Sequence, residues 1–366
     1  MQALHLSSDF EGGNGKLIAL TPNGAEIEIA KDKDAPWSQW FYVKLTGGAG
    51  QERVLTIRNA HATTYSEGWP GYRAFVSEDG EAWLRATTRY EDGALVIRYT
   101  AQSETLWFAY FVPYTVARLE ALLEDARGAG ASLRVLGKSH EDRPIHCVSL
   151  GQGETPVWIV ARQHPGETMA SWWVEGFLRR LVSADPLAQK LLREMSFHIV
   201  PLANIDGAVR GHLRGSASGL DLNRQWAQPD PVLAPEIAAI LRAMEEMGCA
   251  ALVDVHGDET IPHIFTDGDP EASPERSAGL ARFNAALLKE NPAFQVAVGY
   301  DASYAGSGAP GMCARAIGRR FDAVGLTLEM PFKDAEEIPA AAPCWSHEGA
   351  MRLGHDSLAA IAAIFG

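Results

Sequence analysis

VWIVARQHPGE, residues 157–167, joins a run of apolar residues to a histidine and a glutamate, and this stretch decides the fold class. An apolar run that ends in polar residues is typical of a strand in a sheet that is covered on both faces. Three further runs have the same character: SFHIVPLAN (196–204), AALVDVHG (250–257) and AVGLTLEM (323–330). Their spacing leaves room for helices at about 169–182, 232–247, 276–290 and 347–364.

Strands that alternate with helices predict an α/β domain over residues 115–366, with a mixed, mostly parallel sheet and helices on both faces. The part before it has a different pattern. It contains short strands separated by Gly, Asn and Asp: GKLIAL, AEIEIA, QWFYVKL, ERVLTIRNA, ALVIRYTA and LWFAYFV. This pattern predicts an all-β sandwich domain over residues 1–114.

The composition excludes several classes of function. Hydrophobic residues make up 46% of the chain and charged residues 21%, which is typical of a globular protein. A net charge of −14 without clusters of Lys and Arg argues against binding to nucleic acid or to an anionic membrane. The sequence shows no signal peptide, no membrane-spanning run and no CxxC pair among Cys147, Cys249, Cys313 and Cys344. We therefore expect a cytoplasmic protein with reduced thiols.

Polar residues follow each predicted strand of the α/β domain. His164 and Glu167 follow the first strand, His256 follows the third and Glu329 ends the last. In open α/β sheets, ligand sites lie at the carboxyl ends of the strands. We therefore expect these four side chains to meet at one edge of the sheet.

Two histidines and one glutamate form a ligand set that is known for catalytic zinc. His164 and Glu167 stand three residues apart at a strand-to-helix turn, and His256 can complete the set from a neighbouring strand. Glu329 then stays free to exchange protons with a zinc-bound water, whose pKa the metal lowers to about 7. An isolated HxxE motif is usually structural, but here the other residues follow in the required order.

The segment GHLRGSASGLDLNRQW supplies further polar groups. A guanidinium binds a carboxylate through two hydrogen bonds, so Arg224 with Asn223 is suited to hold a substrate carboxylate. Arg214 is suited to stabilise an oxyanion. The alternative is that these arginines pair with Asp206 and Asp221 within a loop.

The motifs HPGE, NxDG, GHLRGSASGLDLNRQW, DVHG and TLEM, in this order, resemble the zinc carboxypeptidase superfamily over residues 115–366. QWFYVKL, the junction FVPYT and GLDLNRQW are similar to the cytosolic carboxypeptidase family, whose members carry a β-sandwich before the catalytic domain. The resemblance implies one zinc ion per chain and peptide or protein C-termini as substrates. It also implies roles for seven residues: zinc ligands His164, Glu167 and His256, general acid/base Glu329, oxyanion stabiliser Arg214, and carboxylate site Asn223 with Arg224.

The family also uses a mobile tyrosine, for which Tyr304 is the candidate and Tyr300 a close competitor. Eukaryotic members remove glutamates from acidic protein tails. This specificity needs a basic group beside the substrate side chain, and Arg315 is the best-placed candidate. The net charge of −14 works against steering acidic tails to the site.

Two other functions remain open. A zinc-dependent amidohydrolase of the aspartoacylase and succinylglutamate desuccinylase type shares the HxxE and LNR motifs but releases an acyl group from an amino acid. A binding module that has kept the fold would not need Glu329. The N-terminal β domain, NxDG and DLNRQW favour the peptidase, and the oligomeric state stays open.

Overall fold

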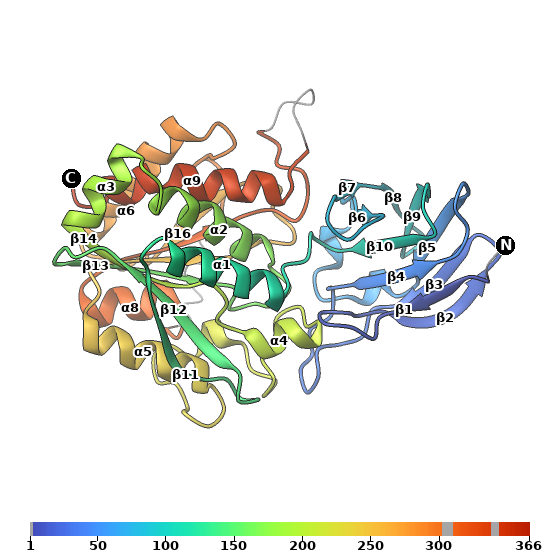
Figure 1. Ribbon diagram of the computed structural model, residues 1–366, viewed down its shortest axis with the longest axis horizontal. Coiled ribbons are helices and arrows are strands. Elements are labelled where there is room, and N and C mark those ends of the chain that lie inside the picture. Colours follow the sequence, from blue (N-terminus) through green and yellow to red (C-terminus); the bar gives the residue numbers. More distant parts are fainter. Residues whose placement is uncertain (1–2, 302–309, 338–343) are drawn as a thin grey trace.

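A computed structural model describes residues 3–301, 310–337 and 344–366, and Figure 1 shows them as two lobes side by side. The smaller lobe contains the strands β1 to β10, and the larger lobe contains every element from α1 onward. The link between β10 and α1 contains the junction of residues 114 and 115. We propose this link as the boundary between the two domains.

The N-terminal lobe is built from two five-stranded sheets. One has the order β1 (His5–Ser7), β4 (Tyr42–Thr46), β10 (Thr105–Ala109), β6 (Phe75–Ser77), β7 (Leu84–Arg85). The other has the order β2 (Lys16–Thr21), β3 (Gly24–Glu28), β5 (Glu52–Ile57), β9 (Ala94–Thr100), β8 (Thr87–Glu91). Alternate residues of β5, such as Leu55 and Ile57, are fully buried, as expected for strands with one face on a core. The prediction of an all-β domain is confirmed.

The larger lobe contains a seven-stranded mixed sheet. Its order is β11 (Ser132–Lys138), β12 (Pro144–Leu150), β14 (Met195–Val200), β13 (Thr155–Ala161), β15 (Ala251–Val255), β17 (Val324–Glu329), β16 (Phe265–Gly268). The four central strands, β14, β13, β15 and β17, are parallel to one another, and the pairs toward both edges are antiparallel. The predicted apolar runs form this parallel centre.

Helices cover the sheet on both faces. Their bounds are α1 (Val116–Gly128), α2 (Met169–Leu181), α3 (Pro186–Glu194), α4 (Ile205–Arg210), α5 (Pro235–Met247), α6 (Pro274–Glu290), α8 (Cys313–Phe321) and α9 (His347–Ala363). Figure 1 shows α2, α6 and α9 on one side of the sheet and α5 and α8 on the other. This confirms the predicted α/β architecture. Leu119, Leu122 and Leu123 form the buried face of α1.

Specific contacts join the two lobes. The ring of Tyr110 stacks on Phe332, with ring centroids 4.3 Å apart. Arg73 of the N-terminal lobe forms an ion pair with Asp334 at 2.7 Å, and the buried Arg85 donates to the carbonyl oxygen of Phe332 at 2.9 Å. Buried aromatic stacking and hydrogen bonds of this kind favour one fixed arrangement of the two lobes.

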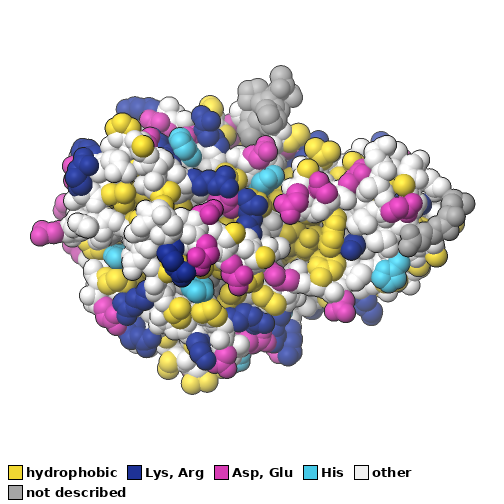
Figure 2. Space-filling model, in the orientation of Figure 1, with side chains coloured by type: hydrophobic (Ala, Val, Ile, Leu, Met, Phe, Trp, Pro, Cys, Tyr) yellow, Lys and Arg dark blue, Asp and Glu magenta, His cyan; other side chains and the backbone are white. Residues whose placement is uncertain are grey.

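The surface charges, the helices and the cysteines can each be compared with the composition. On the face drawn in Figure 2, Lys and Arg side chains are interspersed with Asp and Glu. Within the described ranges, no helix combines the length and the apolar character that a bilayer crossing requires. All four cysteines fall in the described part of the chain and are free, with Cys344 exposed and the other three buried.

Candidate active site

Three side chains converge at the carboxyl ends of β13 and β15, which are parallel neighbours in the sheet. Nδ1 of His164 lies 2.6 Å from Oε1 of Glu167, and Nδ1 of His256 lies 2.8 Å from Oε2 of the same glutamate. The two Nδ1 atoms are 3.2 Å apart. One potential ligand atom from each residue thus falls within 4.8 Å of the others. The structure brings together the three residues that the sequence predicts as metal ligands.

The turn after β13 has an unusual backbone. Arg162 has a φ of 59°, in the left-handed region that costs energy for residues other than glycine. Its buried side chain donates to the carbonyl oxygen of Pro165 at 2.7 Å, which ties the turn to itself. Gly166 packs so closely on Leu213 that an added Cβ would lie 2.9 Å from the Leu213 carbonyl oxygen. These constraints fix the direction in which His164 and Glu167 leave the strand.

In addition to Glu167, a second carboxylate contacts the other ring nitrogen of each histidine. Nε2 of His164 lies 3.1 Å from Asp221, and Nε2 of His256 lies 3.0 Å from Asp254. Carboxylates in this position select the tautomer whose Nδ1 is free to bind a metal, and they orient the ring. Burial raises the pKa of Glu167, but the two histidines outweigh burial and lower it to about 2, so the carboxylate is ionised. This donor set fits zinc.

Glu329 ends β17 beside these residues and is buried. Its Oε1 accepts a hydrogen bond from the Tyr300 hydroxyl at 2.9 Å. Its Oε2 is buried and has no hydrogen-bond partner among the described residues. Burial raises the pKa of Glu329 to about 8, although the nearby His256 acts against this shift. Tyr304, the first candidate for the mobile tyrosine, lies outside the described residues.

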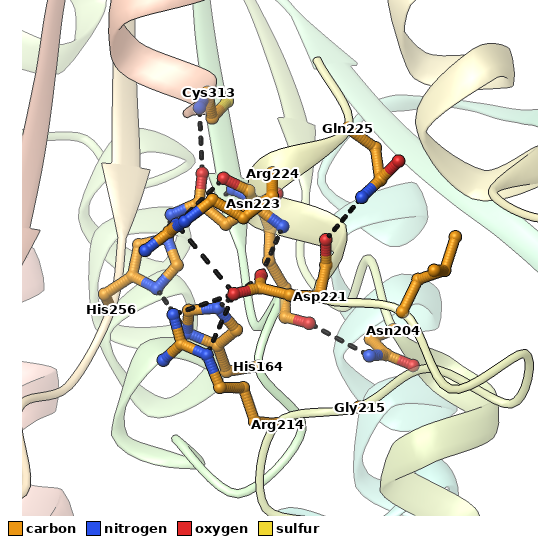
Figure 3. A network of polar contacts seen from close by, with 12 residues as sticks. His164, Asn204, Arg214, Gly215, Asp221, Asn223, Arg224, Gln225, His256 and Cys313 are labelled. Atoms are coloured by element: carbon orange, nitrogen blue, oxygen red, sulfur yellow. Dashed lines mark hydrogen bonds and ion pairs between the residues drawn. The ribbon is translucent and has the colours of Figure 1, made fainter. Parts of the chain in front are cut away.

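Arg214 is held from both lobes. Its guanidinium forms an ion pair with Asp221 at 2.9 Å, and its Nη1 donates to the Tyr65 hydroxyl at 3.2 Å. The buried carboxylate of Asp32 accepts hydrogen bonds from the backbone nitrogens of residues 213, 214 and 215 at 2.7, 2.8 and 2.7 Å. Figure 3 shows His164 and Arg214 both directed toward the carboxylate of Asp221.

The two residues predicted to bind a carboxylate follow directly after Asp221. Oδ1 of Asn223 accepts from the backbone nitrogen of Cys313 at 2.8 Å, and its Nδ2 lies 3.2 Å from Nε2 of His256 (Figure 3). The Arg224 side chain is 30% exposed, and its Nη1 is 3.9 Å from Asp221. The alternative interpretation, in which the arginines pair with an aspartate of their own loop, is therefore observed for Asp221, which contacts both Arg214 and Arg224.

The remaining predicted contacts are placed differently. Asp206 pairs with Arg143, at 2.6 Å, and neither Arg214 nor Arg224 is its partner in the described structure. Arg315 is buried in α8 and forms an ion pair with Asp267 at 3.2 Å.

A cavity of about 490 Å³ opens over the site. His164, Glu167, Arg214, Asn223, Arg224 and Glu329 all line it. Arg315 is not among the described residues that line this cavity. Two of the three predicted metal ligands, the predicted acid/base and the predicted carboxylate site thus line one space, and the third ligand, His256, contacts Glu167 beside it.

Several residues at the site were not predicted. Tyr65 and Glu67 line the cavity from the N-terminal lobe, and Asp32 holds the Arg214 loop. Nothing in their local sequence indicates a site. Glu259, which also lines the cavity, follows the DVHG motif closely, and Asp254 lies within it. Proximity to a predicted ligand was the signal that could have found these two.

Two family models match the chain. The cytosolic carboxypeptidase N-terminal domain matches residues 6–111, and the zinc carboxypeptidase model matches residues 119–308. Among curated proteins, an uncharacterized protein of Zymomonas mobilis is 40% identical over 98% of this chain and 96% of its own length. Human cytosolic carboxypeptidase 1 is 27% identical over 72% of this chain, and the match spans about a quarter (26%) of that longer protein.

Solved structures agree over the whole chain. The metallo-carboxypeptidase from Burkholderia cenocepacia is 36% identical and has a TM-score of 0.94, with 100% of this chain and 99% of that chain covered. The metallo-carboxypeptidase from Pseudomonas aeruginosa is 34% identical, also with a TM-score of 0.94, and 99% of each chain is covered.

Proposed function

Because the chain belongs to the zinc carboxypeptidase family and carries the N-terminal domain of its cytosolic branch, we propose that it removes the C-terminal residue from peptides or proteins. Membership of this family makes the protein a peptide hydrolase. The observation that carries the finer proposal is the single cavity that joins the His164, Glu167 and His256 cluster to Glu329, Arg214 and Arg224.

In this proposal, His164, Glu167 and His256 hold one zinc ion. The converging Nδ1 atoms, the ionised carboxylate and the carboxylates behind both rings support this assignment. Bound there, zinc supplies a Lewis acid that polarises a carbonyl group and lowers the pKa of a coordinated water.

Glu329 is proposed to move the protons. Glu329 lines the same cavity, and its Oε2, which has no hydrogen-bond partner in the described structure, is free to accept a proton from the attacking water. The same oxygen then delivers that proton to the leaving amine. Tyr300, the competitor of Tyr304 for the family's mobile tyrosine, holds the other oxygen in place.

The arginines are proposed to bind the substrate. The partly exposed Arg224, with Asn223, binds the terminal carboxylate, and Arg214 stabilises the oxyanion that develops from the scissile carbonyl. The related metallo-carboxypeptidase from Pseudomonas aeruginosa has been solved in complex with (2-guanidinoethylmercapto)succinic acid. The succinic acid part of this compound carries two carboxyl groups, so that relative binds a molecule that contains carboxylates, in keeping with the role proposed for Arg224 and Asn223.

Two finer expectations stay predictions. A preference for C-terminal glutamate would require a free basic group in the cavity, and the ion pair between Arg315 and Asp267 gives it no support. A cytoplasmic location is consistent with relatives that are named cytosolic carboxypeptidases.

The test compares a peptide with a free C-terminus and its amidated twin, each incubated with the zinc-loaded protein. We expect stepwise release of the C-terminal residue from the free acid and far slower cleavage of the amide. Equal cleavage of the two peptides would refute the proposed carboxypeptidase activity. Hydrolysis of N-acylated single amino acids in preference to every peptide would instead support the acyl-amino-acid amidohydrolase.

A further inference from the structure

The substrate-binding groups form a row of contacts across the cavity. Arg224 contacts Asp221, Asp221 pairs with Arg214, and Arg214 donates to Tyr65. This inference rests on the proposed function, which places the terminal carboxylate at Arg224 and the scissile carbonyl at Arg214. The residue that precedes the scissile bond then extends beyond Arg214, toward Tyr65 and the N-terminal lobe.

Glu259 lies at this end of the row. It is only 6% exposed and lines the cavity. Its backbone carbonyl packs against Gly68, where an added Cβ would lie 2.5 Å from the Glu259 oxygen. The turn that carries Glu259 is therefore seated directly on the segment that carries Tyr65 and Glu67. Both lobes contribute to the wall of the cavity at this point.

In the described part of the chain, no hydrogen bond or ion pair joins the carboxylate of Glu259 to another residue, and its own backbone N–H donates to it. Burial, followed by the charges of Glu167 and Asp258, raises its pKa well above the usual value, and Arg214 offsets this only in part. A buried carboxylate without a partner is costly, and its cost falls when a cation binds beside it. Glu259 is thus a buried acid at the cavity wall that forms no ion pair with a described cation, although Arg214 lies near enough to affect its pKa.

Glu67 adds a second carboxylate to the same wall and is exposed. The charge of Lys333 interacts with Glu67 and Asp258. Lys333 is not among the described residues that line the cavity, so the wall that faces the substrate here remains acidic.

We propose that Glu259, with Glu67, forms a subsite for the cationic side chain of a Lys or Arg residue that immediately precedes the scissile bond. An ammonium or guanidinium group at this position would gain a buried ion pair. A glutamate there would meet two carboxylates, which costs binding free energy because like charges repel at short range. The subsite therefore selects against acidic tails at the residue before the cut.

The test uses free-acid peptides acetyl-Ala-X-Leu in which X is Lys, Gln or Glu, and it measures kcat/KM for release of Leu by the zinc-loaded protein. We expect Lys to exceed Glu by about tenfold or more, with Gln between them. In Glu259→Gln the ratio of Lys to Glu should fall toward one, and Glu67→Gln should lower it less. Glu120→Gln, an exposed acid on α1, should leave the ratio unchanged.

A second series, acetyl-Ala-Ala-X, moves the charge to the released residue. The inference is overturned if Lys is preferred only in this series, if X has no effect in the first series, or if Glu259→Gln keeps the wild-type ratio. Thermal unfolding of Glu259→Gln and Glu67→Gln checks that both variants fold. If no peptide were cleaved, both the proposed function and this inference would be contradicted. Cleavage without a preference for Lys over Glu at X would contradict this inference alone.

Discussion

Oδ2 of Asp32 lies 2.8 Å from the backbone nitrogen of Arg214, although 182 residues separate them in the chain. Asp32 belongs to the N-terminal lobe, and the loop that carries Arg214 belongs to the larger lobe. Hydrogen bonds from backbone N–H groups to a buried carboxylate are charge-assisted and strong. The N-terminal domain thereby fixes the backbone from which the proposed oxyanion-binding side chain projects.

We expect Asp32→Asn to reduce kcat by about tenfold to a hundredfold, because an amide nitrogen would face a backbone donor and displace the Arg214 loop. KM and zinc content should change little, since neither the ligands nor Arg224 contact Asp32. Steady-state kinetics and elemental analysis measure these quantities. Asp9→Asn, an exposed residue of the same lobe, is the matched control. An unchanged kcat in Asp32→Asn would contradict the proposed positioning.

The metal ligands lead to a second prediction. The purified protein should hold about one zinc ion per chain, and His164→Ala should lose most of it, because two remaining ligands bind zinc far more weakly than three. Elemental analysis measures the metal, and circular dichroism should show that the fold persists. His61→Ala, an exposed histidine of the N-terminal lobe, should keep full occupancy. Stoichiometric zinc in His164→Ala would exclude this residue as a ligand.

Glu329 should act on protons without binding the metal. We therefore expect Glu329→Gln to retain zinc and to lose about a thousandfold or more in kcat. The side chain keeps its size, so the loss would reflect proton transfer rather than packing. Loss of zinc from this variant would instead make Glu329 a ligand.

Tyr300 provides a prediction for pH dependence. Its hydroxyl donates to Glu329, and this hydrogen bond lowers the pKa of Glu329, which burial raises to about 8. Tyr300→Phe removes the donor, so the pKa of Glu329 should rise further. A general base must be deprotonated, and kcat/KM increases as pH rises through its pKa. The acidic limb of the kcat/KM profile should therefore move to higher pH in Tyr300→Phe, and a shift to lower pH would contradict the role of this hydrogen bond.

The sequence was sufficient to predict the central strands of the larger lobe and the side chains that meet at their carboxyl ends. His164, His256 and Glu329 each follow an apolar run, and parallel strands bring their carboxyl ends to one edge. The edge strands were missed because their apolar residues do not form such runs. In β11, for example, only Leu136 is buried.

Contacts between the lobes could not be predicted from local patterns. Tyr65 meets Arg214 across 149 residues, and the segment around Tyr65 has no motif that points to a site. The left-handed backbone conformation of Arg162 could not be predicted either, since arginine does not favour that conformation and only the surrounding packing imposes it. The charge of Arg315 and its position in the sequence favour a substrate role, whereas its ion pair with Asp267 depends on the three-dimensional fold.

Arg224 leads to the last prediction. Its side chain is partly exposed and lines the cavity, with Nη1 3.9 Å from Asp221, so a substrate carboxylate in the cavity lies within its reach. Removing one partner of a desolvated charge pair costs roughly 2–5 kcal/mol. Arg224→Ala should therefore slow cleavage of the free-acid peptide strongly and leave the already slow amidated peptide almost unchanged. The ratio of kcat/KM between the two peptides should fall toward one, whereas Arg179→Ala, an exposed arginine on α2, should preserve it. If Arg224→Ala slowed both peptides equally, the arginine would serve the stability of the site, and the terminal carboxylate would have to bind elsewhere.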